Sequence, residues 1–169
     1  FGNSVSGIPD LTGDGRGDVV ISAPEENPGV SPQGAGRAYV FNGSTGEYVR
    51  TLVSPNEQEN GRFGAGFGQA VGGVEDINGD GRGEVIVSGW AETPGRAYIF
   101  DGMTGGLLKA LSSLNGPTAG ASFGDPAVAG VSDANGDGKG DVIVGSSGEH
   151  PGESPVNSGR AFVFFSPLP

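Results

Sequence analysis

The sequence predicts an all-β protein built from three similar units, because three short patterns recur in the same order along its 169 residues. A Phe-Gly pair begins at Phe1, Phe67 and Phe123. An acidic nonapeptide follows as DLTGDGRGD at 10–18, DINGDGRGE at 76–84 and DANGDGKGD at 133–141. A third pattern reads GRAYVFNGSTG at 36–46, GRAYIFDGMTG at 95–105 and, shortened, GRAFVFF at 159–165. We expect a single domain over 1–169, with repeats at approximately 1–62, 63–122 and 123–169.

The second repeat shows most clearly which segments form strands. FGQAVGGV at 67–74 is rich in Gly and Ala, which suits an inner strand where neighbouring backbones approach closely. EVIV at 84–87 and RAYIF at 96–100 are apolar at consecutive positions, which predicts burial on both faces of a sheet. LLKAL at 107–111 is more polar, as an outer edge strand is. Each repeat is therefore predicted to form a four-stranded unit.

Four-stranded units that stack face to face are typical of a β-propeller, in which each unit is one blade. The third repeat reaches FFSPLP where its fourth strand is due, so the third blade is expected to be incomplete. Three blades do not close a ring, and two apolar blade faces would lie in water. We therefore expect self-association into a larger ring, a dimer being the simplest case, or completion by the rest of a longer propeller. An open, capped arc is the alternative.

The charge balance favours a cation as partner. Asp and Glu number 20 against 9 Lys and Arg, and the formal net charge of −11 argues against a nucleic-acid partner. The chain has no Cys and one His, so thiolate sites, zinc sites and histidine-dependent catalysis are poor candidates. No apolar run reaches the length of a membrane span. Since no nucleophile elbow and no carboxylate pair outside the nonapeptides stands out, no enzyme activity is expected.

The nonapeptides have the oxygen-rich spacing of a calcium loop. Positions 1, 3, 5 and 9 carry side-chain oxygens, and Gly at position 6 permits the sharp bend that turns them inward. A main-chain carbonyl at position 7 completes a shell of hard oxygens, which suits calcium better than zinc or copper. The side-chain ligands are predicted to be Asp10, Thr12, Asp14, Asp18, Asp76, Asn78, Asp80, Glu84, Asp133, Asn135, Asp137 and Asp141. The position 7 carbonyls belong to Arg16, Arg82 and Lys139.

Two other interpretations of these loops are weaker. An EF-hand requires a bidentate Glu at position 12, but that position is Ile21, Val87 or Val144. Asp-Gly turns also connect hairpins without a metal. All three copies, however, keep an acid at positions 1, 5 and 9, and neighbouring carboxylates repel one another without a cation. We therefore expect about three Ca²⁺, one in each loop.

The Phe-Gly pair, the D-x-N-x-D-G-x-x-D pattern and the following strand that reaches Ala23-Pro24 resemble the FG-GAP repeat of integrin α-subunit propellers. This resemblance implies calcium in the hairpin between the first and second strands of each blade, bound by the acidic and Asn positions given above. Thr12 replaces the usual Asn or Asp, which predicts weaker binding in the first loop, and Glu84 is longer than the usual Asp. Related repeats occur in surface proteins and lectins.

The first nonapeptide ends in Arg16-Gly17-Asp18, a tripeptide that adhesion receptors bind. The equivalent residues of the other copies are RGE and KGD, so the acid at position 9 recurs and the tripeptide does not. We therefore expect Asp18 to point into a calcium site and not towards a receptor.

The leading functional prediction is a calcium-binding, integrin-like module for extracellular protein or carbohydrate recognition, secreted or on a cell surface. Its ligand is expected on the irregular loops at 23–35, 89–94 and 146–158, at the opposite end of the blades from the calcium loops. Trp90, Glu149 and His150 are the candidate ligand-binding residues, because Trp90 can stack on a sugar ring or anchor a protein partner. The alternatives are spacer repeats of a larger surface protein and a non-catalytic propeller part of a hydrolase.

Overall fold

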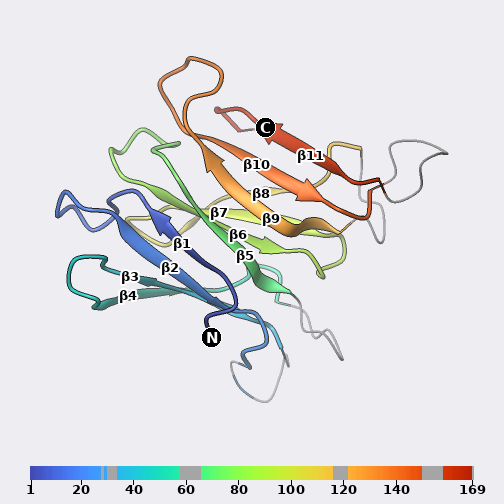
Figure 1. Cartoon of the computed structure of the whole chain (residues 1–169), viewed down its shortest axis with the longest axis horizontal. Coiled ribbons are helices and arrows are strands. Elements are labelled where there is room, and N and C mark those ends of the chain that lie inside the picture. The colour runs from blue at the N-terminus through green and yellow to red at the C-terminus, as the bar shows by residue number, and fades with distance from the viewer. Residues whose placement is uncertain (28, 30–33, 58–65, 116–121, 150–157, 169) are drawn as a thin grey trace.

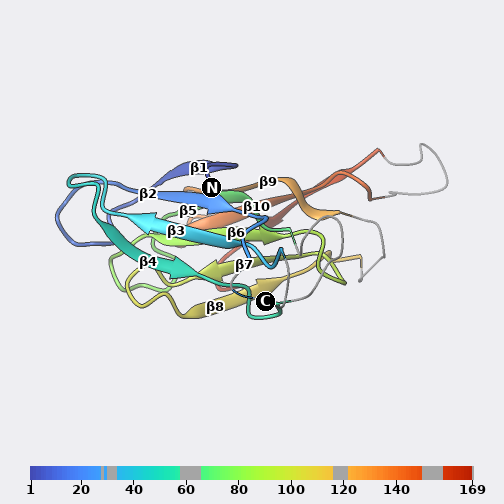
Figure 2. The same ribbon diagram turned by 90° about the horizontal axis from the view of Figure 1, so that it is seen from below.

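The structure is a computed structural model of the chain, and it describes residues 1–27, 29, 34–57, 66–115, 122–149 and 158–168. These residues form strands, turns and loops, with no helix among them. The strands make three antiparallel sheets that follow one another along the chain, and Figures 1 and 2 show the sheets stacked as twisted layers. The predicted all-β fold of propeller blades is confirmed, and the sheets do not close into a ring.

Within each sheet the strands lie side by side in chain order, as successive hairpins require. The first contains β1 (Val5–Ile8), β2 (Asp18–Ala23), β3 (Arg37–Phe41) and β4 (Tyr48–Leu52). The second contains β5 (Phe67–Val74), β6 (Glu84–Gly89), β7 (Arg96–Phe100) and β8 (Leu107–Leu111). The third contains, within the described residues, β9 (Phe123–Val131), β10 (Asp141–Ser146) and β11 (Arg160–Phe164). The predicted strands of the second repeat match β5, β7 and β8 residue for residue, and β6 extends beyond the predicted EVIV segment.

The second sheet is buried on both faces because a neighbouring sheet packs on each. Val85 and Val87 of β6 contribute to a core shared with the first sheet, while Ile86 between them contributes to a core shared with the third. Successive side chains of a strand point to opposite faces, so a run of consecutive apolar residues supplies both cores at once. Every residue of β6 is buried, which confirms the two-sided burial predicted from the sequence.

The phenylalanine of each Phe-Gly pair contacts two aromatic rings on the third strand of its own sheet. The ring centroid of Phe67 lies 6.1 Å from those of both Tyr98 and Phe100, and Phe123 packs in the same way on β11. Phe67 is completely buried, as a residue that anchors one blade on the next is expected to be. Phe1 makes the same contacts on β3, yet it is 75% exposed, because no sheet formed by the described residues covers this face.

Glycine allows the inner strands of neighbouring sheets to approach very closely. A Cβ atom at Gly73 of β5 would lie 2.5 Å from the main-chain oxygen of Gly7 in β1. One at Gly130 of β9 would lie 2.2 Å from the main-chain oxygen of Gly73. Any larger residue would therefore push the sheets apart, which explains the glycines predicted for a crowded inner strand.

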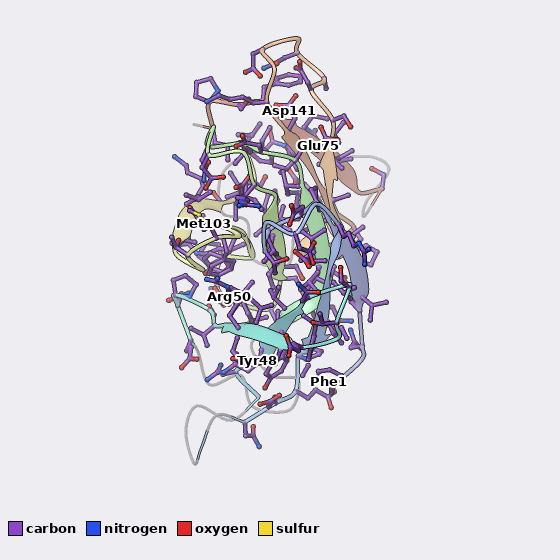
Figure 3. The ribbon with its side chains drawn as sticks, turned by 90° about the vertical axis from the view of Figure 1, so that its left-hand side faces the viewer. Phe1, Tyr48, Arg50, Glu75, Met103 and Asp141 are labelled. Carbon is purple, nitrogen blue, oxygen red and sulfur yellow. The ribbon has the colours of Figure 1, made fainter. Side chains whose placement is uncertain are left out.

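The outward faces of the first and third sheets are apolar and uncovered. Val5 in β1 is 64% exposed, whereas Val71, at the equivalent place in β5, is buried. Val163 in β11 is likewise exposed, whereas Ile99 in β7 is buried. Figure 3 shows Phe1 at one extreme of the stack of sheets and Asp141, in the third sheet, near the other. The first and third sheets thus each expose an apolar face, whereas both faces of the second sheet are covered by neighbouring sheets.

Candidate metal centre in the hairpin loops

The three acidic nonapeptides connect the first and second strands of each sheet, as predicted. Strand pairing ends at Ile8 with Asp18, at Val74 with Glu84 and at Val131 with Asp141. Position 9 of each nonapeptide is therefore the first residue of a strand, and the preceding positions form the loop. Figure 1 shows these loops, joining β1 to β2, β5 to β6 and β9 to β10, at the same end of the three sheets. We call them the first, second and third loops.

The Asp at position 1 holds each loop in shape with its own carboxylate. In the first loop, Asp10 accepts hydrogen bonds from the N–H groups of Gly13 at 2.6 Å and Gly15 at 2.8 Å. The second and third loops repeat these bonds through Asp76 and Asp133. Positions 4 and 6 are glycines with φ between +80° and +88° in all three loops, a conformation that other residues rarely adopt. Sequence reasoning had singled out the glycine at position 6 but not the one at position 4.

The residue at position 7 completes the turn through its N–H group. Arg16, Arg82 and Lys139 each donate to the carboxylate at position 5, over 2.9, 2.8 and 2.9 Å respectively. In the second and third loops the amide oxygen at position 3, from Asn78 or Asn135, also accepts the N–H of position 5. Thr12 makes no such bond among the described contacts, so the first loop lacks one of the restraints that the other two share.

The second loop brings three carboxylates together. Oxygen atoms of Asp76, Asp80 and Glu84 all lie within 4.8 Å of one another. Glu84 is fully buried, and its Oε2 accepts the N–H of Ile77 at 2.7 Å. Its Oε1 has no hydrogen-bond donor among the described residues. Burial, together with the neighbouring carboxylates of Asp80 and Asp76, raises the pKa of Glu84 to about 8.

This arrangement fits a hard cation. The converging groups are all oxygens, which is the donor set that calcium and magnesium prefer. A buried carboxylate oxygen without a donor is costly unless a positive charge lies next to it. A cation between these three carboxylates would satisfy Glu84 Oε1 and relieve their mutual repulsion.

The first and third loops instead direct protein N–H groups at the acid in position 9. Asp18 accepts the N–H of Leu11 at 2.9 Å and of Thr12 at 3.0 Å on one oxygen, and that of Gly43 at 3.0 Å on the other. Asp141 accepts the N–H of Ala134 and of Ser166, each at 2.8 Å, on its two oxygens. Only 2% of Asp18 is exposed, so the Arg16-Gly17-Asp18 tripeptide does not present its carboxylate at the surface.

The turn after the third strand of each sheet lies beside the acidic loop of that sheet and alters the surroundings of its carboxylates. In the first sheet, Asn42 and Ser44 donate to Asp14 over 3.1 and 2.9 Å. These two hydrogen bonds lower the pKa of Asp14. In the third sheet, Ser166 donates to Asp137 over 2.8 Å and lowers its pKa in the same way.

The second loop has an additional carboxylate where the first loop has an amide. Asp101, in the turn between β7 and β8, accepts a hydrogen bond from Asn78 at 3.2 Å. It occupies the place that Asn42 occupies in the first sheet, since each follows the last residue of its third strand. The second loop therefore has one more carboxyl group beside it than the first loop has.

An arginine from the second loop reaches back to the first. The guanidinium of Arg82 lies 3.4 Å from the carboxylate of Asp10, and both side chains are partly exposed. A Cβ atom at Gly13 would lie within 2.3 Å of this guanidinium, so Gly13 also makes room for it. The main chains are joined too, because Gly83 donates its N–H to the carbonyl of Asp10 at 3.4 Å. The first loop thus has a cationic side chain on one of its own predicted ligands.

Two of the candidate ligand-binding residues, Trp90 and Glu149, lie away from these loops. Trp90 is half-buried after β6, and its indole N–H is buried without an acceptor among the described residues. Glu149 is buried and accepts hydrogen bonds from Ser113 and Asn115, so its carboxylate already has partners within the protein. His150 lies outside the described residues.

Comparison with known proteins identifies the family. The FG-GAP repeat matches residues 1–41 and 126–164, and an FG-GAP-like repeat matches residues 76–144. The chain belongs to the FG-GAP repeat family. This confirms the resemblance seen in the Phe-Gly pairs and the acidic nonapeptides.

Among curated proteins, FG-GAP relatives of the chain include several integrin alpha subunits. Integrin alpha-PS5 of Drosophila melanogaster is 35% identical over 170 residues, covering 96% of this chain and 16% of the relative. Integrin alpha-IIb of Mus musculus is 33% identical, and integrin alpha-5 of Xenopus laevis is 31% identical, each over 159 residues. Each of these two alignments covers 88% of this chain and 15% of the relative. The chain therefore spans about a sixth of the length of the relatives it matches.

Proposed function

We propose that the chain is a calcium-binding part of an FG-GAP propeller whose role is recognition of a protein or glycan outside the cell. The fold supports a binding role, since propeller blades present loops from a rigid scaffold. The relatives named integrin alpha support an adhesion role and a secreted or cell-surface location. No helix able to span a membrane occurs in the part of the chain that the structure describes.

The observation that carries the calcium proposal is the free oxygen of Glu84. This buried oxygen has no hydrogen-bond donor among the described residues, and the Glu84 carboxylate lies beside those of Asp76 and Asp80, so a cation is the natural partner. The all-oxygen donor set points to calcium, and calcium outside cells is present at the millimolar concentrations that fill modest extracellular sites. Asp76, Asp80 and Glu84 would bind the ion, which neutralises charge and fixes the turn between β5 and β6. We propose further ions in the first and third loops, with lower affinity.

The uncovered faces of the end sheets support completion of the propeller by further blades. The face around Val5 and Phe1 has the same apolar composition as the face of the second sheet that packs on the first. A second copy of the chain or other blades of a longer propeller would bury it. Light scattering on the purified chain tests the first possibility, because a stable monomer at all concentrations excludes the dimer.

Thermal unfolding tests the calcium proposal. We expect EGTA to lower the melting temperature and a return to millimolar calcium to restore it, because an ion that binds only the folded state stabilises it. At calcium concentrations about 100 times Kd, the gain is about 2.7 kcal/mol. Magnesium at the same concentration is the matched control and should stabilise less, since it demands a tighter octahedral geometry. An unchanged melting temperature on both chelation and calcium addition would refute bound calcium.

A glycan array and a panel of extracellular matrix proteins test the recognition role, with the chain in calcium. Specific binding that is lost in EGTA is the expected result. Binding to neither panel would favour spacer repeats of a larger surface protein instead.

A further inference from the structure

A recurring contact joins each sheet to the next at the ends of the strands that lie opposite the three acidic loops. It links the connector that follows the fourth strand of one sheet to a buried glutamate that follows the second strand of the next. In the first junction, the hydroxyl of Ser54 and the amide of Asn56 both donate to the carboxylate of Glu92. Tyr98 donates its hydroxyl to the same carboxylate. Both Ser54 and Glu92 are buried, so the carboxylate is satisfied by neutral donors from two sheets.

The second junction repeats this contact with different residues. Ser113 donates to the two oxygens of Glu149 over 3.1 and 3.2 Å, and Asn115 donates over 2.5 Å. Ser and Asn are again separated by one residue. In both connectors the Ser hydroxyl also accepts the N–H of the Asn, at 3.0 Å in Asn56 and 3.2 Å in Asn115. A Ser-x-Asn turn therefore presents two donors side by side, and a buried Glu of the next sheet accepts both.

The first sheet has the equivalent glutamate, but no Ser-x-Asn connector contacts it among the described residues. Glu26 follows β2 as Glu92 follows β6, and its N–H closes the same turn, on Ala23 at 3.1 Å where Glu92 bonds Gly89 at 3.2 Å. Tyr39 donates to Glu26 as Tyr98 donates to Glu92. Among the described residues, however, no Ser or Asn side chain donates to Glu26, and its side chain remains partly exposed.

A hollow lies where the connector would fit. Its volume is about 460 Å³, and its lining includes Phe1, Gly2, Asn3, Pro24, Glu25 and Glu26. The equivalents of Phe1 and Glu26 in the second sheet, Phe67 and Glu92, are both buried beneath the first sheet and its connector. The hollow is thus the same site without its occupant, and it lies beside Phe1, which Figure 3 shows at one extreme of the stack of sheets.

We propose that this hollow receives a Ser-x-Asn connector from a preceding FG-GAP blade that lies outside these 169 residues, with Glu26 accepting both side-chain donors. The two Ser-x-Asn turns of the chain itself are already engaged with Glu92 and Glu149, so a second copy has none of its described connectors to offer. The proposal rests on the propeller completion proposed above and specifies the contact that sets the order of blades. A glutamate with one tyrosine donor has room for the two further donors that Glu92 receives.

The test uses the full chain and a synthetic peptide of its own first connector, residues 51–57 (TLVSPNE). Titration is followed by ¹H–¹⁵N NMR, first in EGTA and then in calcium. We expect saturable shifts confined to Gly2, Asn3, Glu25, Glu26 and their neighbours, with a Kd on the order of millimolar for so short a peptide. A peptide in which the Ser is replaced by Ala should bind at least tenfold more weakly.

Two chain variants make the result specific. Glu26→Ala should weaken peptide binding at least tenfold, whereas Glu47→Ala, which removes the same charge from an exposed residue in the turn between β3 and β4, should change it less than twofold. No shifts at 10 mM peptide, shifts elsewhere, or equal effects of the two variants would overturn the proposal. Shifts of the same residues on concentrating the chain without peptide would show a second copy on this face and would also overturn it. Binding in EGTA separates this outcome from a failure of the calcium proposal.

Discussion

The first and second loops have the same residue at six of nine positions, yet they offer a cation different surroundings. In the first loop, Arg82 lies against Asp10, Asn42 and Ser44 donate to Asp14, and three N–H groups donate to Asp18. In the second loop, Glu84 has a free buried oxygen and Asp101 adds a further carboxylate nearby. The differences arise mostly from residues outside the nonapeptide. We therefore expect neighbouring turns and the next blade to determine how strongly each loop attracts a cation.

Neutralising Glu84 should have the largest effect on the difference in calcium affinity expected between the first and second loops. Glu84→Gln keeps the size of the side chain but removes its charge, so we expect the tightest calcium site to weaken at least tenfold, or about 1.4 kcal/mol. Isothermal titration calorimetry measures the affinity, and the amide signals of Gly15, Gly81 and Gly138 report which loop binds. Without calcium the variant should melt no lower than the original chain, because burial already disfavours the charged carboxylate.

Asp18→Asn is the comparison for this variant. Because Asp18 belongs to the first loop, its replacement should change the tightest site less than twofold. If Glu84→Gln left the tightest site intact and Asp18→Asn removed it, the order of the two loops would be the reverse of the one inferred here.

Exchanging the residues of the neighbouring turns should have the next largest effect. Asp101→Asn is expected to weaken calcium binding in the second loop about three- to tenfold, and Asn42→Asp to strengthen it in the first loop by a similar factor. The reason is that one charge near the ion contributes about 1 kcal/mol where water screens the interaction. Either residue can close its turn, since Asp101 accepts the N–H of Thr104 and Asn42 accepts that of Thr45. Loop-resolved NMR titration measures both effects. Affinities that stay unchanged after both exchanges would mean that the turns do not tune the loops.

The sequence predicted the fold closely because each signal is local. The Phe-Gly pairs, the consecutive apolar residues of EVIV and the glycines of the inner strand each depend on residues within one repeat. The positions of the carboxylates in the loops were also predictable, since they share one tight turn in which position 1 binds the N–H groups of positions 4 and 6.

What could not be predicted depends on contacts between blades. Thr12 was the residue expected to distinguish the first loop, but the structure adds Arg82, which comes from the next repeat and is conspicuous only once the sheets are stacked. Glu84, expected to be a departure from the usual Asp, is the acid that keeps an oxygen free. Glu149, expected on a ligand surface, is buried because the connector of the preceding blade covers it.

Removing the arginine that reaches the first loop should have a smaller effect. Arg82→Gln is expected to strengthen calcium binding in the first loop about two- to fivefold, because partly exposed ion pairs contribute between about 0.2 and 1 kcal/mol. The Gly15 amide signal follows this site during a calcium titration. Lys139→Gln is the control, as it removes a cation from the same position of the third loop. An equal effect of the two variants would point to net charge and not to the contact with Asp10.

The smallest effect is expected from Thr12→Asn, which gives the first loop the residue found at position 3 of the other two. Asn78 and Asn135 accept the N–H of position 5 at 2.8 and 3.0 Å, so the variant should gain this restraint and a better oxygen ligand. We expect binding in the first loop to strengthen about twofold, since the charge of the loop does not change. The Gly15 signal measures it, alone and together with Arg82→Gln. If the combined variant still binds more weakly than the second loop, the remaining difference lies in the donors that surround the other carboxylates of the first loop, namely Asn42 and Ser44 on Asp14 and three N–H groups on Asp18.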